Sequence, residues 1–164
     1  MEIEGLDSLL RDLDTKGQAI KAEVAAEIEA SSVTIVTEAK LAAPKDVGFL
    51  AGAIQAVPEK ELVWDILAKK KYAPYVEFGT RGSVSVPAEL QAYASQFQGK
   101  GNSEIPARQA IYDWCKRKGI TKKAWFFIFM KIMKVGTKPH PFLFPAFNAE
   151  RPKLLARIKA ILNQ

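Results

Sequence analysis

Few residues of this 164-residue chain are of the types that carry out enzymatic chemistry. The one histidine, His140, lies between two prolines, and the one cysteine, Cys115, has no second thiol with which to form a disulfide. A zinc ion needs several His, Cys or carboxylate ligands close together, and no second His or Cys cluster completes such a site. We therefore expect no metal site and no cofactor, and we interpret His140 as a structural residue of a turn.

Other catalytic motifs are also missing from the sequence. The serines lie in no Gly-x-Ser-x-Gly elbow, and there is no glycine loop of the Walker or Rossmann kind. The segment 79–82 holds two glycines three positions apart, which a turn explains without a nucleotide. The carboxylates are scattered, and nothing singles out an acid–base pair. We expect a protein that is not an enzyme, and a hydrolase with an unrecognised carboxylate site is the weakest of the alternatives.

Positive charge is unevenly distributed along the chain, whose net charge is +6. Residues 1–50 hold 5 Lys/Arg against 10 Asp/Glu, whereas residues 101–164 hold 13 against 3. This division fits a nucleic-acid contact through the basic segment 116–138, or attraction between neighbouring subunits of an assembly. No helix-turn-helix, zinc-finger or RNA-binding aromatic signature is present, so nucleic-acid binding is the second of the two hypotheses.

Residues 122–135 predict a helix that is apolar on nearly every side, with Thr121 as its N-cap and Gly136 at its end. One small domain cannot cover all the faces of such a helix, so it belongs either to the core or to an oligomer interface. The candidate interface residues are Trp125, Phe126, Phe129 and Met133.

The chain begins with helical patterns. Residues 3–13 predict a short amphipathic helix, and Gly17 is expected to weaken or kink the helical segment after it. Residues 15–43 then predict a long helix, which Pro44 ends. Its apolar stripe, at spacings of three and four, consists of Ile20, Val24, Ile28, Ser31, Ile35, Ala39 and Ala42.

The remaining segments predict a mixed fold. Residues 51–57 and 62–67 predict an antiparallel hairpin, and 81–103 a surface loop. A helix is expected at 104–118, with Ser103 as its N-cap, and a last helix is expected to start at Asn148 with Pro152 in its first turn. The fold class is therefore α+β, with a long N-terminal helix and a C-terminal helix packed on a small antiparallel sheet.

The length is that of one ordinary domain, so we expect residues 1–164 to form a single domain. The longest apolar run, Ala124–Met130, has seven residues, while a membrane span needs about 20. We therefore expect no contact with a membrane, and the lone cysteine favours a protein assembled inside a cell.

Three separated stretches follow one another in a familiar order. The first, residues 42–54, includes Pro44, Asp46 and Gly48. The second, residues 72–80, is the most specific and includes Tyr72, Ala73, Tyr75, Glu77, Phe78, Gly79 and Thr80. The third, residues 138–147, includes Pro141, Phe142 and Pro145. Together they resemble the signature blocks of the neck or tail-completion proteins of long-tailed bacteriophages.

This resemblance implies a non-enzymatic virion protein at the head–tail junction. Such proteins assemble as homo-oligomeric rings between the head connector or stopper and the tail terminator or tail-tube proteins, with DNA only as the content of the channel. The implied location is the virion, and the host cytoplasm during assembly. Residues 81–136 match the family least and look like a variable loop plus a two-helix insertion. Val47 and Ala53 stand where the family usually has threonine and serine.

The chemistry of the block residues fits this role. Asp46 and Gly48 can form a tight turn between helix and strand. Tyr72, Tyr75 and Phe78 offer large anchoring surfaces. Glu77 among them would be costly if buried alone, so we expect a backbone, Lys or Arg partner, from its own chain or from an adjacent subunit.

The prolines of the third block, Pro141 and Pro145, make the approach to the last helix rigid. They would hold Phe142 in a fixed direction, and packing within the fold is the default interpretation of that aromatic side chain.

Overall fold

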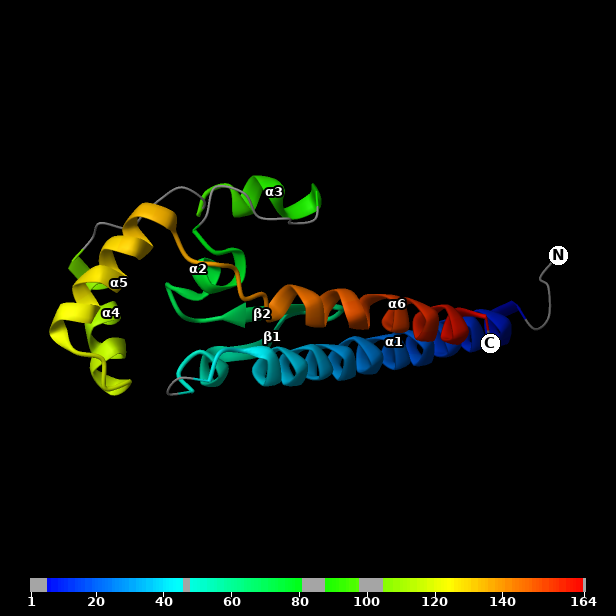
Figure 1. The fold of residues 1–164 in the computed structure, drawn as a ribbon. Helices are drawn as coiled ribbons and strands as arrows, with labels where there is room; N and C mark the ends of the chain where they lie inside the picture. The colour runs from blue at the N-terminus through cyan, green and yellow to red at the C-terminus, as the bar shows by residue number, and fades with distance from the viewer. Residues whose placement is uncertain (1–5, 46–47, 81–87, 98–104, 164) are drawn as a thin grey trace. The chain divides into compact units, whose positions relative to one another are not determined.

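A computed structural model describes residues 6–45, 48–80, 88–97 and 105–163 (Figure 1). It divides into two compact units, the first formed by Met1–Lys69 with Phe142–Gln164 and the second by Lys70–Pro141. The elements, in chain order, are α1 (Leu6–Ala42), the 3-10 turn η1 (Ala51–Ala53), β1 (Ile54–Lys60), β2 (Val63–Ala68), α2 (Ala73–Phe78), α3 (Ala88–Ala94), α4 (Ile105–Arg117), α5 (Lys122–Val135) and α6 (Leu143–Leu162). The predicted α+β class is confirmed, and the fold is mostly helical.

The N-terminal region forms one continuous helix rather than two. Helix α1 has 37 residues, a length of about 55 Å, and it passes through Gly17 without a break. The expected short helix ending at residue 13 is therefore wrong over its described part, and residues 3–5 lie outside the description. A mid-helix glycine costs only about 1 kcal/mol, which the rest of so long a helix can offset.

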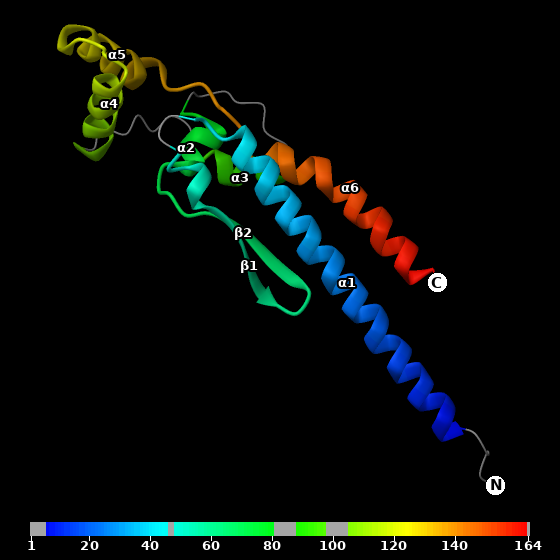
Figure 2. The same ribbon diagram turned by 90° about the horizontal axis from the view of Figure 1, so that it is seen from below.

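The predicted apolar stripe of α1 is confirmed in the middle of the helix. Ser31, Ile35 and Ala39 are all buried, whereas Ile20 is 36% exposed and Ala42 lies in solvent. Helix α6 packs against α1 in the antiparallel sense (Figures 1 and 2). Helix α1 also contacts both strands, so it is the element around which the first unit is built.

The two strands form an antiparallel hairpin, as predicted, in which Ile54 pairs with Ala68 and Ala56 with Ile66. The first strand begins at Ile54 and not at Ala51, because residues 51–53 form the turn η1. Along β2, half-buried and exposed residues alternate, as expected for a strand with one face on a helix. The pairing becomes irregular between Pro58 and Lys60, where proline cannot donate to the ladder.

The second unit contains a helix that the loop prediction missed. Helix α3 covers Ala88–Ala94, inside the segment 81–103 that was expected to be a surface loop. Its composition, Ala-Glu-Leu-Gln-Ala-Tyr-Ala, consists largely of good helix formers, and the Gly/Ser-rich flank concealed it. The other parts of that segment, 81–87 and 98–104, lie outside the described residues.

The next two helices agree closely with the prediction. Helix α4 covers 105–117, and Gly119 after it has φ +69°. Helix α5 covers 122–135, and the Thr121 hydroxyl accepts a hydrogen bond from the Ala124 N–H at 3.4 Å. Gly136 ends α5 with φ +74°. The predicted cap Ser103 lies outside the described residues.

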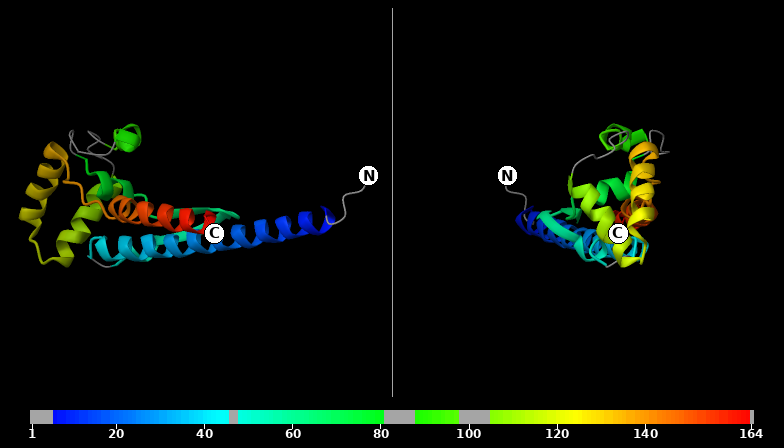
Figure 3. Two further views of the ribbon diagram at one scale, coloured as in Figure 1. Left: turned by 90° about the vertical axis from the view of Figure 1, so that its right-hand side faces the viewer. Right: turned by 60° about the vertical axis from the view of Figure 1, so that its left-hand side comes forward.

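The last helix begins earlier than predicted. Helix α6 starts at Leu143, so Asn148 is not its cap and Pro152 lies in its interior. The proline of the first turn is Pro145, where no N–H is needed. Pro152 cannot donate to the Asn148 carbonyl, and both residues are exposed, so water can satisfy that oxygen. Helix α6 continues past Pro152 to Leu162. Figure 3 shows α6, in orange to red, beside α1.

Among the described residues, no helix is both long and apolar enough to cross a membrane.

Candidate functional site

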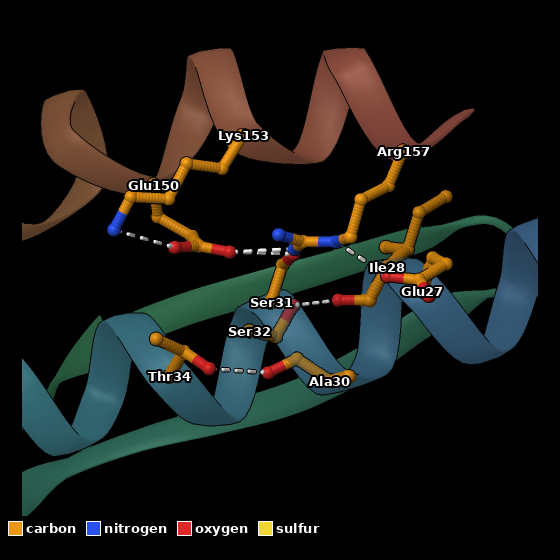
Figure 4. Close-up of polar contacts among 9 residues, drawn as sticks. All are labelled: Glu27, Ile28, Ala30, Ser31, Ser32, Thr34, Glu150, Lys153 and Arg157. Carbon is orange, nitrogen blue, oxygen red and sulfur yellow. Dashed lines mark hydrogen bonds and ion pairs between the residues drawn. The ribbon is translucent and has the colours of Figure 1, made fainter. Parts of the chain in front are cut away.

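A partly buried polar network joins α1 to α6 in the first unit (Figure 4). Its members, which we call the interhelix network, are Glu27, Ser31, Glu150 and Arg157. Ser31 and Glu150 are only 1% and 5% exposed, so their polar atoms need partners. The Ser31 hydroxyl donates to Glu150 Oε1 at 3.1 Å.

Arg157, in the C-terminal half of α6, completes this network. Its Nη2 donates to Glu150 Oε1 and to Ser31 Oγ, both at 2.6 Å, and its Nε donates to Glu27 Oε2 at 2.7 Å. One guanidinium thus bridges a carboxylate of α1 and a carboxylate of α6. The contacts connect residues that are 119 to 130 positions apart in sequence, so they fix how α6 is aligned on α1.

The electrostatics of the network favour the charged forms. The hydrogen bond from Arg157 is the largest influence on the pKa of Glu150; it outweighs burial, and the pKa lies below its ordinary value. The hydrogen bonds to Glu150 and Glu27 raise the pKa of Arg157. An ionised carboxylate held by two donors has no proton to give and is occupied by its partners. The arrangement is therefore suited to holding two helices together.

Sequence reasoning missed Glu150 and Arg157 as site residues. The available signal was a serine in the apolar stripe of α1, together with an acid and an arginine seven residues apart on α6. Seven residues are two helical turns, so both side chains lie on one face. The pairing across two distant helices could not be derived from local spacing.

The first sequence block forms the turn between α1 and β1. Gly48 has φ +73°, and its carbonyl accepts a hydrogen bond from the Gly52 N–H at 2.9 Å. Leu50 and Ile54 after it are 4% and 1% exposed, so this block contributes two side chains to the core of the first unit. Pro44 is half-buried and follows the end of α1, as predicted. Asp46, the predicted turn residue, lies outside the described residues.

The structure brings the second and third blocks together within the second unit. Gly79 has φ +68°, and a Cβ there would lie 2.7 Å from both the Pro139 nitrogen and the Thr137 oxygen. Only glycine fits this position, because the left-handed backbone and the close approach both exclude a side chain.

Hydrogen bonds from backbone and hydroxyl groups also join the segments around Gly79 and Thr137, where the two stretches of chain cross. The Thr80 N–H donates to the Thr137 carbonyl at 3.2 Å, and the Thr137 N–H donates to Thr80 Oγ1 at 2.8 Å. The His140 N–H donates to the Val76 carbonyl at 2.8 Å. Hydrogen bonds thus join two blocks that are about 60 residues apart in the chain.

The aromatic residues of the second block pack within the chain. Tyr75 meets Phe97 edge to face with ring centroids 5.3 Å apart, and Phe78 lies 5.8 Å from Tyr93. Tyr72 is 45% exposed. Two of the three predicted anchors therefore hold α2 to the region of α3.

The other block residues are mostly enclosed. Ala73 and Glu77 of α2 are buried, and Glu77 is not left without a partner. Phe142, which belongs to the first unit, is 1% exposed. Pro141 and Pro145 on either side of it are exposed.

Comparison with known proteins gives one match. Residues 6–79 match the family model described as "Bacteriophage HK97-gp10, putative tail-component". Residues 6–79 are an HK97-gp10-like segment. No curated protein and no solved structure matches the chain. The predicted resemblance to phage tail proteins is confirmed over residues 6–79, and the family that matches there is described as a putative tail component, a structural role.

The HK97-gp10-like segment covers α1, the hairpin and α2, and therefore holds the first block and the second block up to Gly79. The third block and α3, α4 and α5 lie after it in the chain. The crossing at Gly79 and Thr137 lies where the matched segment ends.

Beyond the HK97-gp10-like segment, α5 exposes much of its apolar surface, and none of its residues is buried. Of the predicted interface residues, Phe126 is 50% exposed, whereas Trp125, Phe129 and Met133 are half-buried. The Trp125 ring stacks on Phe129 with centroids 6.0 Å apart, so both contribute to packing within the chain. The prediction omitted two exposed side chains, Phe127 at 72% and Met130 at 49%.

A cavity of about 440 Å³ lies beside α4 and α5, lined by Arg108, Gln109, Tyr112, Lys122 and Trp125. The Arg108 guanidinium lies 5.6 Å from the centre of the Trp125 ring, a cation–π distance. The buried Trp125 Nε1 has no acceptor within the described part of the chain. The lining carries two cations, Arg108 and Lys122, and no His, Cys or carboxylate. The described residues contain no cluster of three His, Cys, Asp or Glu that could hold an ion.

Proposed function

We propose that this chain is a structural protein of the phage head–tail junction. It assembles into a homo-oligomeric ring and completes the tail or joins it to the head. Its partners in this role are the head connector or stopper on one side and the tail terminator or tail-tube protein on the other. DNA passes through the ring as the content of the channel, and no catalytic step is involved.

The observation that carries this proposal is the HK97-gp10-like match over residues 6–79. The matched elements are a long helix, a hairpin and a short helix. Apolar side chains on α5 are exposed in the single chain. Exposed apolar patches of this kind are typical of surfaces that become buried against a partner.

A direct test of the ring is the mass and shape of the purified full-length chain. Light scattering and negative-stain electron microscopy should reveal closed particles with a central opening. A chain that remains monomeric both alone and in the presence of purified head connector would contradict the proposed ring.

A second candidate function is nucleic-acid binding through the basic segment 116–138. One observation favours it: Lys122, Lys123, Lys131 and Lys134 are exposed on α5. Gel shifts of duplex DNA at two salt concentrations test it, because phosphate contacts weaken steeply with salt. Tight, salt-sensitive binding by a monomer would favour this function over the ring.

A further inference from the structure

We propose that α5 of one subunit docks on the solvent face of α1 of the next subunit, a second copy of this chain. This proposal rests on the proposed ring and names the contact that builds it. It assigns a role to two exposed surfaces that belong to different units of the chain. One surface is apolar and basic, and the other is apolar and acidic.

The first surface lies on α5 and combines apolar with basic side chains. We call it the α5 docking face, and its positions, spaced by 4, 3 and 4 residues, are Lys123, Phe127, Met130 and Lys134. This spacing places them on one side of a helix, and all four are exposed. Phe127 and Met130 supply the apolar centre, at 72% and 49% exposure. The two lysines flank that centre at either end.

The second surface lies on α1, on the side away from its buried stripe. We call it the α1 docking stripe, and its positions, spaced by 3, 4, 3, 4 and 4 residues, are Glu23, Ala26, Ala30, Val33, Thr37 and Leu41. All six are exposed. Val33 and Leu41 are 53% and 61% exposed, and Glu29 lies beside the stripe in solvent. A helix face that only meets solvent is usually polar, so the exposed apolar side chains in this stripe favour a partner.

The two surfaces complement each other in shape and charge. The small Ala26 and Ala30 leave room for large side chains such as Phe127 and Met130 to approach the helix. Glu23 and Glu29 form no ion pair with any described residue, and the same holds for Lys123 and Lys134. Opposite charges at the rim of an apolar contact favour the correct partner and its alignment.

A second copy fits better than DNA or an unrelated protein. DNA could meet the lysines of α5, but it would leave the acidic, apolar stripe of α1 uncovered. A copy of the chain satisfies both surfaces at once. Because the two surfaces differ, the contact is head-to-tail, and repeated head-to-tail contacts close into a ring or continue as a filament.

Paired charge reversals test this contact. One variant, Lys123→Glu with Lys134→Glu, changes the α5 docking face. The other, Glu23→Lys with Glu29→Lys, changes the α1 docking stripe. Each variant places like charges opposite each other in every contact of its own oligomer. We expect each to raise the concentration of half-assembly by about tenfold or more in sedimentation or light scattering.

Mixing the two variants in equal amounts should restore assembly. In an alternating oligomer every contact then pairs surfaces of opposite charge: the two changed surfaces meet in one contact, and the two native surfaces meet in the next. A chain that carries all four substitutions should assemble alone, because all its contacts pair opposite charges again. Glu59→Lys, at an exposed position of the hairpin, is the matched control and should assemble like the wild type. Circular dichroism should be the same for all variants, because every substituted side chain is exposed.

The outcomes separate this contact from the proposed function. A wild-type ring that neither variant weakens would overturn the contact and leave the ring standing. Variants that weaken assembly, while the chain with all four substitutions does not recover it, would overturn docking of these two surfaces on each other. Loss of duplex DNA binding by the α5 variant, with assembly unchanged, would assign the α5 docking face to DNA. A wild type that stays monomeric at millimolar concentration and low salt, both alone and with purified head connector, would overturn the contact and the ring together.

Discussion

Replacing Glu150 by glutamine tests the interhelix network most sharply, because it removes a charge while preserving shape. Glu150 is 5% exposed and accepts hydrogen bonds from Arg157 and Ser31. Hydrogen bonds to charged groups contribute about 1.5–3 kcal/mol and neutral ones about 0.5–1.5. The glutamine oxygen still accepts both bonds, so mainly the charged component is lost. Arg157, whose side chain is 38% exposed, regains some hydration.

We therefore expect the Glu150→Gln variant to lose about 1–2 kcal/mol of unfolding free energy at pH 7. For a chain of this size, that is a fall in Tm of roughly 2–8 °C. Urea denaturation followed by far-UV circular dichroism measures it. Glu59→Gln on the exposed hairpin is the control and should change stability little, since surface substitutions stay within about 0.5 kcal/mol.

The pH dependence supplies a second readout with a definite sign. The pKa of Glu150 is lowered from 4.5, so the unfolded chain binds this proton more readily than the folded one. Its stabilising contribution is present above about pH 4.5 and is lost as the pH falls through the lower folded-state pKa. The stability difference between wild type and Glu150→Gln should therefore shrink as the pH falls below about 4.5. A difference that is absent at pH 7, or equally large in acid, would refute the assigned role of the carboxylate.

Two further substitutions test the backbone interpretations. Gly79→Ala should destabilise the second unit by more than about 2 kcal/mol, because φ is +68° and a Cβ would lie 2.7 Å from two backbone atoms. Limited proteolysis within 70–141 checks it, and a variant as resistant as wild type would argue against that crossing. Pro152→Ala should stabilise α6 by about 1–3 kcal/mol, since the new N–H can bond to the Asn148 carbonyl. Thermal unfolding decides this, and a lower Tm would show that the proline is favourable where it is.

Local signals predicted some elements almost to the residue. Helix α5 runs from 122 to 135 as expected because Thr121 and Gly136 mark its ends through chemistry that acts within one turn. The hairpin was found because Pro58 and the charged residues after it separate two alternating runs. The block residues were found by resemblance, and the family match supports the first two blocks.

Other features could not be predicted, because they depend on distant contacts or because two local sequence signals are equally good. Pro145 and Pro152 can each occupy the first turn of a helix, so the sequence could not decide where α6 begins. Glu150 finds its partner Ser31 119 positions away, a distance at which helical spacing carries no information. The exposure of Phe127 and Met130 likewise depends on which faces of α5 the rest of the chain covers.

The most direct test of the central claim is to count joined particles by electron microscopy when the gene for this chain is removed from a phage that carries it. If the proposed role at the head–tail junction is right, loss of the chain leaves DNA-filled heads and separate tails. Adding the purified wild-type chain to that lysate should restore joined, infectious particles. Normal numbers of joined virions without the chain would contradict the account.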